Sequence, residues 1–237
     1  MEFVCNFIWE RNGREQNEDA LVLQQVTKEG KEYLLAVVCD GIGGLPEGEN
    51  ASSFVADSLG KELMRLLEQR RGLSMRSWRN AFLRKLYQCH QLLRAYGKER
   101  EIRLGTTLSM IFLCENKGYI FQAGDSVIFA GKRRLKRLSN VHRTKNGALK
   151  QAVGAGQNLK VEWKKVNIRK GSVILLASDG FYQRIEKQLT DQSVVKQLTK
   201  QGSEGEQDIK KWLQDKYRET KQEGERDNAT AICVVCR

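Results

Sequence analysis

The sequence predicts an α+β fold in which antiparallel sheets are flanked by helices. Three observations lead to this prediction: β-rich runs lie near both ends of the chain, helical periodicity is confined to separate blocks, and strands and helices do not alternate as in βαβ units. With 237 residues, 40% of them hydrophobic, the chain is long enough to bury a sizeable core. It has one proline and no linker-like segment, so we expect residues 1–237 to form a single domain.

Three short β-rich runs come first, at residues 3–9, 20–26 and 33–39, and the third is a near-continuous apolar segment typical of a buried strand. The apolar period then becomes helical. Two long amphipathic helices are indicated by the spacing of Val55, Leu59, Leu63 and Leu66, and of Trp78, Phe82, Leu86, Cys89 and Leu93. Gly72 and Ser74, between the two helices, are typical of a helix stop and a helix cap.

Further strands are predicted at residues 107–114, 118–123, 127–130, 161–168 and 172–177, with a hairpin turn at residues 116–118. Helical spacing returns over residues 209–217, before a closing strand at residues 231–236. Residues 132–150 differ from the rest of the chain because they include eight basic residues and no acidic one. We call them the basic segment and expect an exposed, electropositive hairpin and loop. This segment either helps recruit an acidic partner or is only a solvated loop, and the two interpretations are about equally good.

Composition limits the classes of function. The chain has 41 Lys and Arg against 29 Asp and Glu, and this net charge of +12 suggests an acidic partner without choosing one. No stretch approaches the roughly 20 apolar residues of a membrane span, and the first residues do not resemble a secretory signal. We therefore expect a soluble, cytoplasmic protein that binds no membrane.

The six cysteines lie mostly within apolar runs and lack the spacing of a disulfide framework or a four-ligand zinc site. Cys233 and Cys236 form a Cys-x-x-Cys pair, which can be redox-active or bind zinc. Because the pair lies in a strand-like run without a second ligand pair, we interpret all six cysteines as small core residues in a reducing compartment.

Acidic residues stand where strands begin or end. Asp40 and Asp179 follow apolar runs and precede glycine, whereas Asp19 and Asp227 directly precede strands. Any one of them could be an ordinary turn residue. Clustered carboxylates would repel one another without a multivalent cation, and with only two histidines in the chain the pattern favours magnesium or manganese over zinc.

Six motifs together resemble the metal-dependent type-2C (PPM) Ser/Thr protein phosphatases, in particular a minimal bacterial-like domain. They are GREQNEDA at 13–20, VCDGIGG at 38–44 with GENAS at 48–52, GTTL at 105–108, AGDS at 123–126, LLASDG at 175–180 and DNAT at 227–230. Each motif is weak alone, but six in order are a specific signal. The family's β-sandwich of two antiparallel sheets with helices on both sides agrees with the predicted strand and helix blocks.

The resemblance implies hydrolysis of phosphoserine and phosphothreonine by a water that two Mn²⁺ or Mg²⁺ ions activate. Asp40 resembles the carboxylate that bridges the two ions, and Arg14 resembles the arginine that binds the substrate phosphate. The resemblance further implies Asp179 and Asp227 as ligands of one ion, and Glu18 with the Gly41 carbonyl as ligands of the other. Asp19 resembles an adjacent residue that ligates an ion or orients metal-bound water. Asp125 resembles a ligand of a third, weaker ion, although a turn aspartate is nearly as good an interpretation.

Three positions depart from the family's pattern. Ile42 stands where many eukaryotic members have a histidine proposed as general acid, Val127 where the Gly-Asp-Ser motif is usually followed by arginine, and Gln183 where an acidic residue is common. The stretch between Asp125 and Asp179 is also short for a bacterial member. We expect a truncated flap around residues 140–152 and a more open cleft.

The partners implied are phosphorylated proteins and a cognate Ser/Thr kinase, and we expect a monomer. One alternative is a catalytically silent module that binds phosphoproteins or a regulatory partner, although all principal ligand positions are filled. Another is a nucleic-acid-binding module, suggested by the +12 charge, but aromatic residues are 8% of the chain and are not interleaved with the basic ones. The basic surplus is better interpreted as attraction for acidic, phosphorylated substrates.

Overall fold

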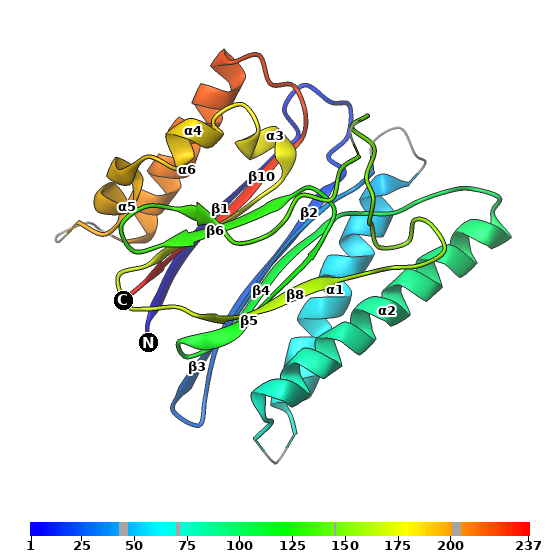
Figure 1. The fold of residues 1–237 in the computed structure, drawn as a ribbon, viewed down its shortest axis with the longest axis horizontal. Helices are drawn as coiled ribbons and strands as arrows, with labels where there is room; N and C mark the ends of the chain where they lie inside the picture. Colours follow the sequence, from blue (N-terminus) through cyan, green and yellow to red (C-terminus); the bar gives the residue numbers. More distant parts are fainter. Residues whose placement is uncertain (43–46, 70–71, 145, 201–204) are drawn as a thin grey trace.

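The computed structural model describes residues 1–42, 47–69, 72–144, 146–200 and 205–237 and consists of two antiparallel sheets packed against each other with helices outside both (Figure 1). The predicted α+β class, with a β-sandwich at its centre, is therefore confirmed. One sheet has the order β2-β3-β4-β5-β8, with bounds Asp19–Lys28, Lys31–Asp40, Leu108–Cys114, Lys117–Ala123 and Glu162–Asn167. The other has the order β1-β10-β9-β6-β7, with bounds Phe3–Glu10, Ala229–Cys236, Val173–Ala177, Val127–Gly131 and Lys136–Arg137.

Central strands are apolar on both faces because each face is covered. In β3, Leu34, Ala36 and Val38 pack between the sheets, while the alternate residues contact the helices outside. In β10, Ile232 and Val234 likewise face the sandwich interior. This double burial explains why these strands are near-continuous hydrophobic runs rather than alternating ones.

Two long helices, α1 (Gly48–Leu67) and α2 (Met75–Glu99), cover the outer face of the β2-β3-β4-β5-β8 sheet (Figure 1). The hydroxyl of Ser74 accepts a hydrogen bond from the Ser77 amide and caps α2, as predicted. The indole of Trp78 in α2 stacks on Phe112 of β4 at a centroid separation of 4.6 Å. No helix in the described ranges is long and apolar enough to cross a membrane.

The outer face of the β1-β10-β9-β6-β7 sheet is covered by α6 (Glu206–Gln222) and three short helices, α3 (Asp179–Tyr182), α4 (Glu186–Leu189) and α5 (Gln192–Leu198) (Figure 1). The sequence predicted α6 but not the three short helices, because four to seven residues are too few for a periodic apolar pattern. The predicted hairpin turn between β4 and β5 is displaced, since Glu115 and Asn116 make it and Glu115 has a positive φ of 56°.

The cysteines carry no disulfide in the described part of the chain. Cys233 and Cys236 lie within β10 and are buried, as predicted, and Cys39 and Cys89 are buried as well. Cys5 and Cys114 are half-buried, so the expectation of six core residues was wrong for these two. Burial raises the pKa of the Cys236 thiol to about 12, which agrees with a packing role.

Candidate active site

One edge of the sandwich brings together the acidic residues that the sequence placed at strand ends. Asp19 opens β2 and Asp40 closes β3, and the two are directly paired in the antiparallel register. In the other sheet, Ala177 at the end of β9 pairs with both Val127 of β6 and Ala231 of β10. Asp179, Asp125 and Asp227 flank these three strands, so antiparallel pairing places the five aspartates at a common edge.

A cavity of about 390 Å³ opens at this edge. Seven of the eight predicted site residues line it: Arg14, Glu18, Asp40, Gly41, Asp125, Asp179 and Asp227. The eighth, Asp19, is buried and is not part of the lining. A larger cavity of about 490 Å³, formed mainly by apolar residues of α1 and α2, contains none of these residues.

Asp40 is held by its backbone. Its amide donates to the Thr107 hydroxyl at 3.0 Å, and its carbonyl accepts from the Thr107 amide at 2.8 Å and the Thr106 hydroxyl at 2.9 Å. Burial, followed by the carboxylates of Asp19 and Asp179, raises the pKa of Asp40 well above its usual range. The fold therefore fixes this carboxyl group among like charges that disfavour its ionised form.

Asp19 is paired with Asp40 in the strand register and is only 3% exposed. Its Oδ2 accepts a hydrogen bond from the Ser178 hydroxyl at 2.9 Å, and its Oδ1 makes no hydrogen bond of normal geometry within the described residues. Burial raises the pKa of Asp19 to about 7, although the Thr230 and Ser178 hydroxyls lower it.

Glu18 and Gly41 meet where β2 begins and β3 ends. The Gly41 amide donates to the Glu18 carbonyl at 3.0 Å, and the Ser52 hydroxyl of α1 donates to the same carbonyl at 2.6 Å. A Cβ atom at Gly41 would lie 2.6 Å from the Gly48 backbone, so only glycine fits there. Burial and then the Glu49 carboxylate raise the pKa of Glu18.

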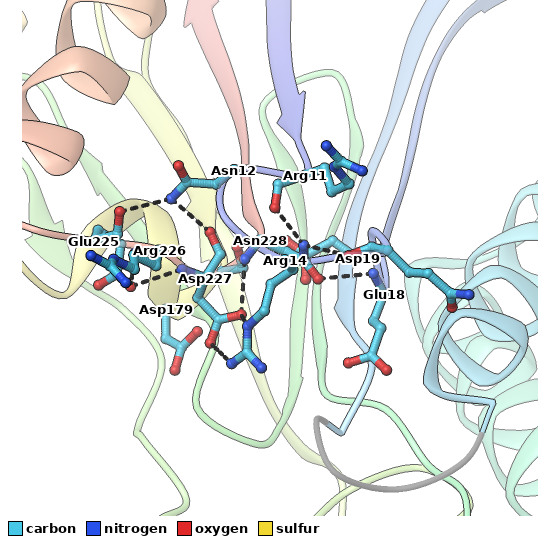
Figure 2. Close-up of polar contacts among 12 residues, drawn as sticks. Arg11, Asn12, Arg14, Glu18, Asp19, Asp179, Glu225, Arg226, Asp227 and Asn228 are labelled. Atoms are coloured by element: carbon cyan, nitrogen blue, oxygen red, sulfur yellow. Dashed lines mark hydrogen bonds and ion pairs between the residues drawn. The ribbon is translucent and has the colours of Figure 1, made fainter.

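Arg14 forms a bidentate ion pair with Asp227 through two nitrogens of its guanidinium. Nε donates to Oδ1 at 2.9 Å and Nη2 to Oδ2 at 2.8 Å. Figure 2 shows this pair, with the guanidinium and the carboxylates of Asp179 and Glu18 pointing to the same side. Asn12 donates to the Asp227 carbonyl at 3.0 Å and fixes the backbone beside the pair.

Arg143 is a cavity residue that the site prediction missed. Its Nε donates to Asp125 Oδ2, and its Nη2 donates to Asp179 Oδ2 at 2.5 Å. Both carboxylates raise the pKa of Arg143, although burial opposes them. The only signal in the sequence was its membership of the basic segment, most of which is exposed as expected.

The three departures from the family's pattern have structural counterparts. Ile42 lines the cavity, and its amide donates to the Gly105 carbonyl at 3.0 Å. Val127 is fully buried in the core between β6 and the short helices, so its side chain does not enter the cavity. Gln183 is exposed at the C-terminal end of α3 and does not line the cavity.

The donor set fits hard divalent cations. Every predicted ligand offers oxygen atoms, which Mg²⁺ and Mn²⁺ prefer. Burial, followed by neighbouring carboxylates, raises the pKa values of Asp40, Asp179 and Glu18, so a bound cation would favour their ionised forms. Among the described residues, no three acidic, histidine or cysteine side chains stand close enough to chelate an ion as they are placed. Arginines instead bind three of the aspartates, so cations already occupy part of the carboxylate surface.

Gly180, which follows the cavity residue Asp179, packs closely against the Asn228 backbone, and this packing can be tested by its effect on stability. A Cβ atom on Gly180 would lie 2.2 Å from the Asn228 carbonyl oxygen, a backbone atom that cannot rotate away. We expect Gly180→Ala to lower the free energy of unfolding in urea by about 3 kcal/mol. Gly72→Ala is the control, because a Cβ atom there meets nothing within 4 Å, and a change below about 0.5 kcal/mol is expected. Equal stability of the two variants would contradict the close approach at Gly180.

Comparison with known proteins agrees with the resemblance that the sequence motifs showed. A sequence model of the family described as protein phosphatase 2C matches residues 10–215. A candidate protein phosphatase of Mycoplasma genitalium is 26% identical over 236 residues, a match that covers 85% of this chain and 84% of that protein.

Solved structures match the fold over nearly the whole chain. The serine/threonine phosphatase Stp1 from Staphylococcus aureus has a TM-score of 0.81 and 19% identity, with 100% of this chain and 96% of that chain covered. PppA of Pseudomonas aeruginosa, a regulatory component of a type VI secretion system, has a TM-score of 0.78 and 21% identity, with 100% and 99% covered. At these identities the two structures show a shared fold.

Proposed function

The chain belongs to the protein phosphatase 2C family and is a protein phosphatase, and from this premise we propose that the acidic cavity is its active site. The proposed reaction is hydrolysis of phosphoserine and phosphothreonine with two bound Mn²⁺ or Mg²⁺ ions. The observation that carries it is the position of the predicted residues: seven of them, drawn from five separated sequence motifs, line one cavity at one edge of the sandwich.

We assign the ligand roles by the same resemblance. Asp40 would bridge the two ions, with Asp179 and Asp227 on one of them and Glu18 with the Gly41 carbonyl on the other. The buried Asp19, next to Asp40 in the register, would ligate an ion or orient metal-bound water. When bound, two divalent cations lower the pKa of a water molecule and neutralise charge on the phosphate.

Arg14 would bind the substrate phosphate. It already holds a carboxylate in the cavity through two parallel hydrogen bonds, and a phosphate presents the same pair of coplanar oxygens to the guanidinium. The Arg14 side chain is half exposed, so a substrate can reach it from solvent.

We expect Arg14→Ala to raise KM for a phosphothreonine peptide about 10- to 100-fold, since a charge-assisted pair of hydrogen bonds to phosphate is lost. Mn²⁺ affinity should not fall, because in the metal-free chain Arg14 engages Asp227, a proposed ligand. Steady-state kinetics and titration calorimetry check the two halves of this prediction. Arg11→Ala is the control, because Arg11 is exposed and outside the cavity lining. Weaker Mn²⁺ binding with unchanged KM would contradict the assigned role.

Protonation of the leaving group falls to water in this proposal. The cavity lining includes Ile42, and no histidine belongs to it among the described residues. His142 lies nearby, but it is engaged with Gly124 and Glu162.

The basic segment would attract acidic phosphoproteins. Lys132, Arg133, Arg134 and Lys136 are exposed on and beside the β6–β7 hairpin, and such charge accelerates encounter with an oppositely charged partner. The flap around residues 140–152 is proposed to be short and the cleft open. We further propose that the chain acts as a single-domain monomer on cytoplasmic phosphoproteins, opposite a cognate Ser/Thr kinase.

The proposal is tested by measuring hydrolysis of an aryl phosphate and of a phosphothreonine peptide with and without Mn²⁺ or Mg²⁺. Metal-dependent turnover of both substrates supports it. Phosphopeptide binding without turnover would instead support a silent, phosphoprotein-binding member of the family, and salt-dependent retention on nucleic acid without turnover would support a nucleic-acid-binding module.

A further inference from the structure

We propose that Arg143 serves as a built-in cation at the Asp125 and Asp179 carboxylates, and that it excludes a third divalent ion from that position. The inference rests on the proposed function for the two-ion centre and extends it to the neighbouring pair of aspartates. Arg143 would then be a positioning residue, since it holds two carboxylates in place without touching substrate.

The contacts are those of a cation that bridges two acids. Nε of Arg143 donates to Asp125, and Nη2 donates to Asp179 at 2.5 Å. The Asp125 side chain is 4% exposed and that of Asp179 is 18% exposed, so water gives them little compensation. Each aspartate accepts the hydrogen bond of Arg143 through its Oδ2, which leaves Asp179 Oδ1 for the two-ion centre.

The backbone places Arg143 at this position. The adjacent His142 donates from its amide to the Gly124 carbonyl at 2.8 Å, and its Nδ1 accepts from the Gly124 amide at 3.3 Å. Residues 142 and 124 are thus paired, and their successors, Arg143 and Asp125, are brought face to face. The Lys150 amide donates to the His142 carbonyl at 2.7 Å and closes the loop.

Asp125 is held from the other side as well. The Tyr182 hydroxyl of α3 donates to the Asp125 carbonyl at 3.1 Å, and Gly124 has a φ of 105°, with a Cβ position only 2.7 Å from the Thr107 side chain. Asp125 and the residue before Arg143 are therefore both held by hydrogen bonds that involve their backbone.

Charge decides what such a bridge does. A guanidinium remains protonated at any pH at which the protein is folded, and its planar donors match carboxylate oxygens. A divalent ion between Asp125 and Asp179 would have to displace Arg143 or lie against its positive charge, and either requirement weakens binding.

The proposal is tested by counting the Mn²⁺ ions that each variant binds. Titration calorimetry measures the binding directly, and electron paramagnetic resonance measures the Mn²⁺ that stays free. We expect two ions on the wild-type chain and on Arg143→Lys, which keeps the charge. Arg143→Ala should bind one additional ion weakly, and Arg143→Ala combined with Asp125→Asn should lose that ion again. Arg137→Ala is the matched control, because Arg137 belongs to the same basic segment but pairs with Glu186; it should bind two ions.

A third ion on the wild-type chain with the affinity found for Arg143→Ala would overturn the proposal, and so would an unchanged number of ions in Arg143→Ala. Thermal unfolding of each variant shows whether it is folded before binding is interpreted. The count of ions is independent of turnover. If the protein bound Mn²⁺ but hydrolysed no phosphopeptide, the proposed function would fail, and a difference of one ion between the variants would still support the role of Arg143.

Discussion

Asp40→Asn is expected to lower kcat for phosphopeptide hydrolysis about a thousandfold or more. Asp40 is the proposed bridge between the two ions, and the transition-state stabilisation that bound cations supply is worth several kcal/mol. The fold itself should tolerate the change. Burial and the surrounding carboxylates disfavour a charge on Asp40, so a neutral amide of the same shape should leave the metal-free protein as stable as the parent or more stable.

Activity and thermal unfolding are therefore measured together. Asp57→Asn serves as the control, because Asp57 is an exposed carboxylate of α1 outside the cavity, and we expect parental activity from it. Retention of a tenth of parental turnover by Asp40→Asn would show that the assignment of the bridge is wrong. A large loss of stability would show instead that Asp40 supports the fold.

The second large effect is the dependence of the stability of the metal-free protein on pH. The pKa of Asp19 is raised from 3.8 to about 7, so the folded chain keeps a proton on this carboxyl group between those values while the unfolded chain releases it. The contribution of Asp19 to stability is therefore complete below about pH 4 and is lost as the pH rises towards 7. In the presence of a chelator, the melting temperature should fall by several degrees between pH 5 and pH 8 from this cause alone.

Asp19→Asn isolates the effect, because the amide does not titrate. The melting temperature of the parent relative to Asp19→Asn should fall as the pH rises, and the stabilisation of the parent by added Mn²⁺ should be larger at pH 8 than at pH 5, since protons compete with the ions for carboxylates. Parallel pH profiles of the two chains without metal would contradict the raised pKa of Asp19.

Most of the fold could be predicted from local pattern. The helical spacing of residues such as Leu59 and Phe82, and the apolar run that ends at Asp40, each reflect burial of one element and can be seen within a short window. The short helices α3, α4 and α5 were missed because they are stabilised by packing under the second sheet rather than by their own periodicity. The two-residue strand β7 was missed as a separate element because two exposed residues show no alternation, and the strand exists through its pairing with β6.

The sequence by itself determined which carboxylates stand at strand ends and, through ordered motifs, the family to which the chain belongs. Only the tertiary structure decided how arginines pair with those carboxylates. Arg14 binds Asp227, which lies 213 residues away in the sequence, and Arg143 binds Asp125 and Asp179, which lie 18 and 36 residues away. Strand and helix patterns reflect which face of one element is buried, and that period can be seen within a short stretch of sequence. A pairing of charges across the edge of a sandwich depends on strand order and register, which are set by packing of the whole chain.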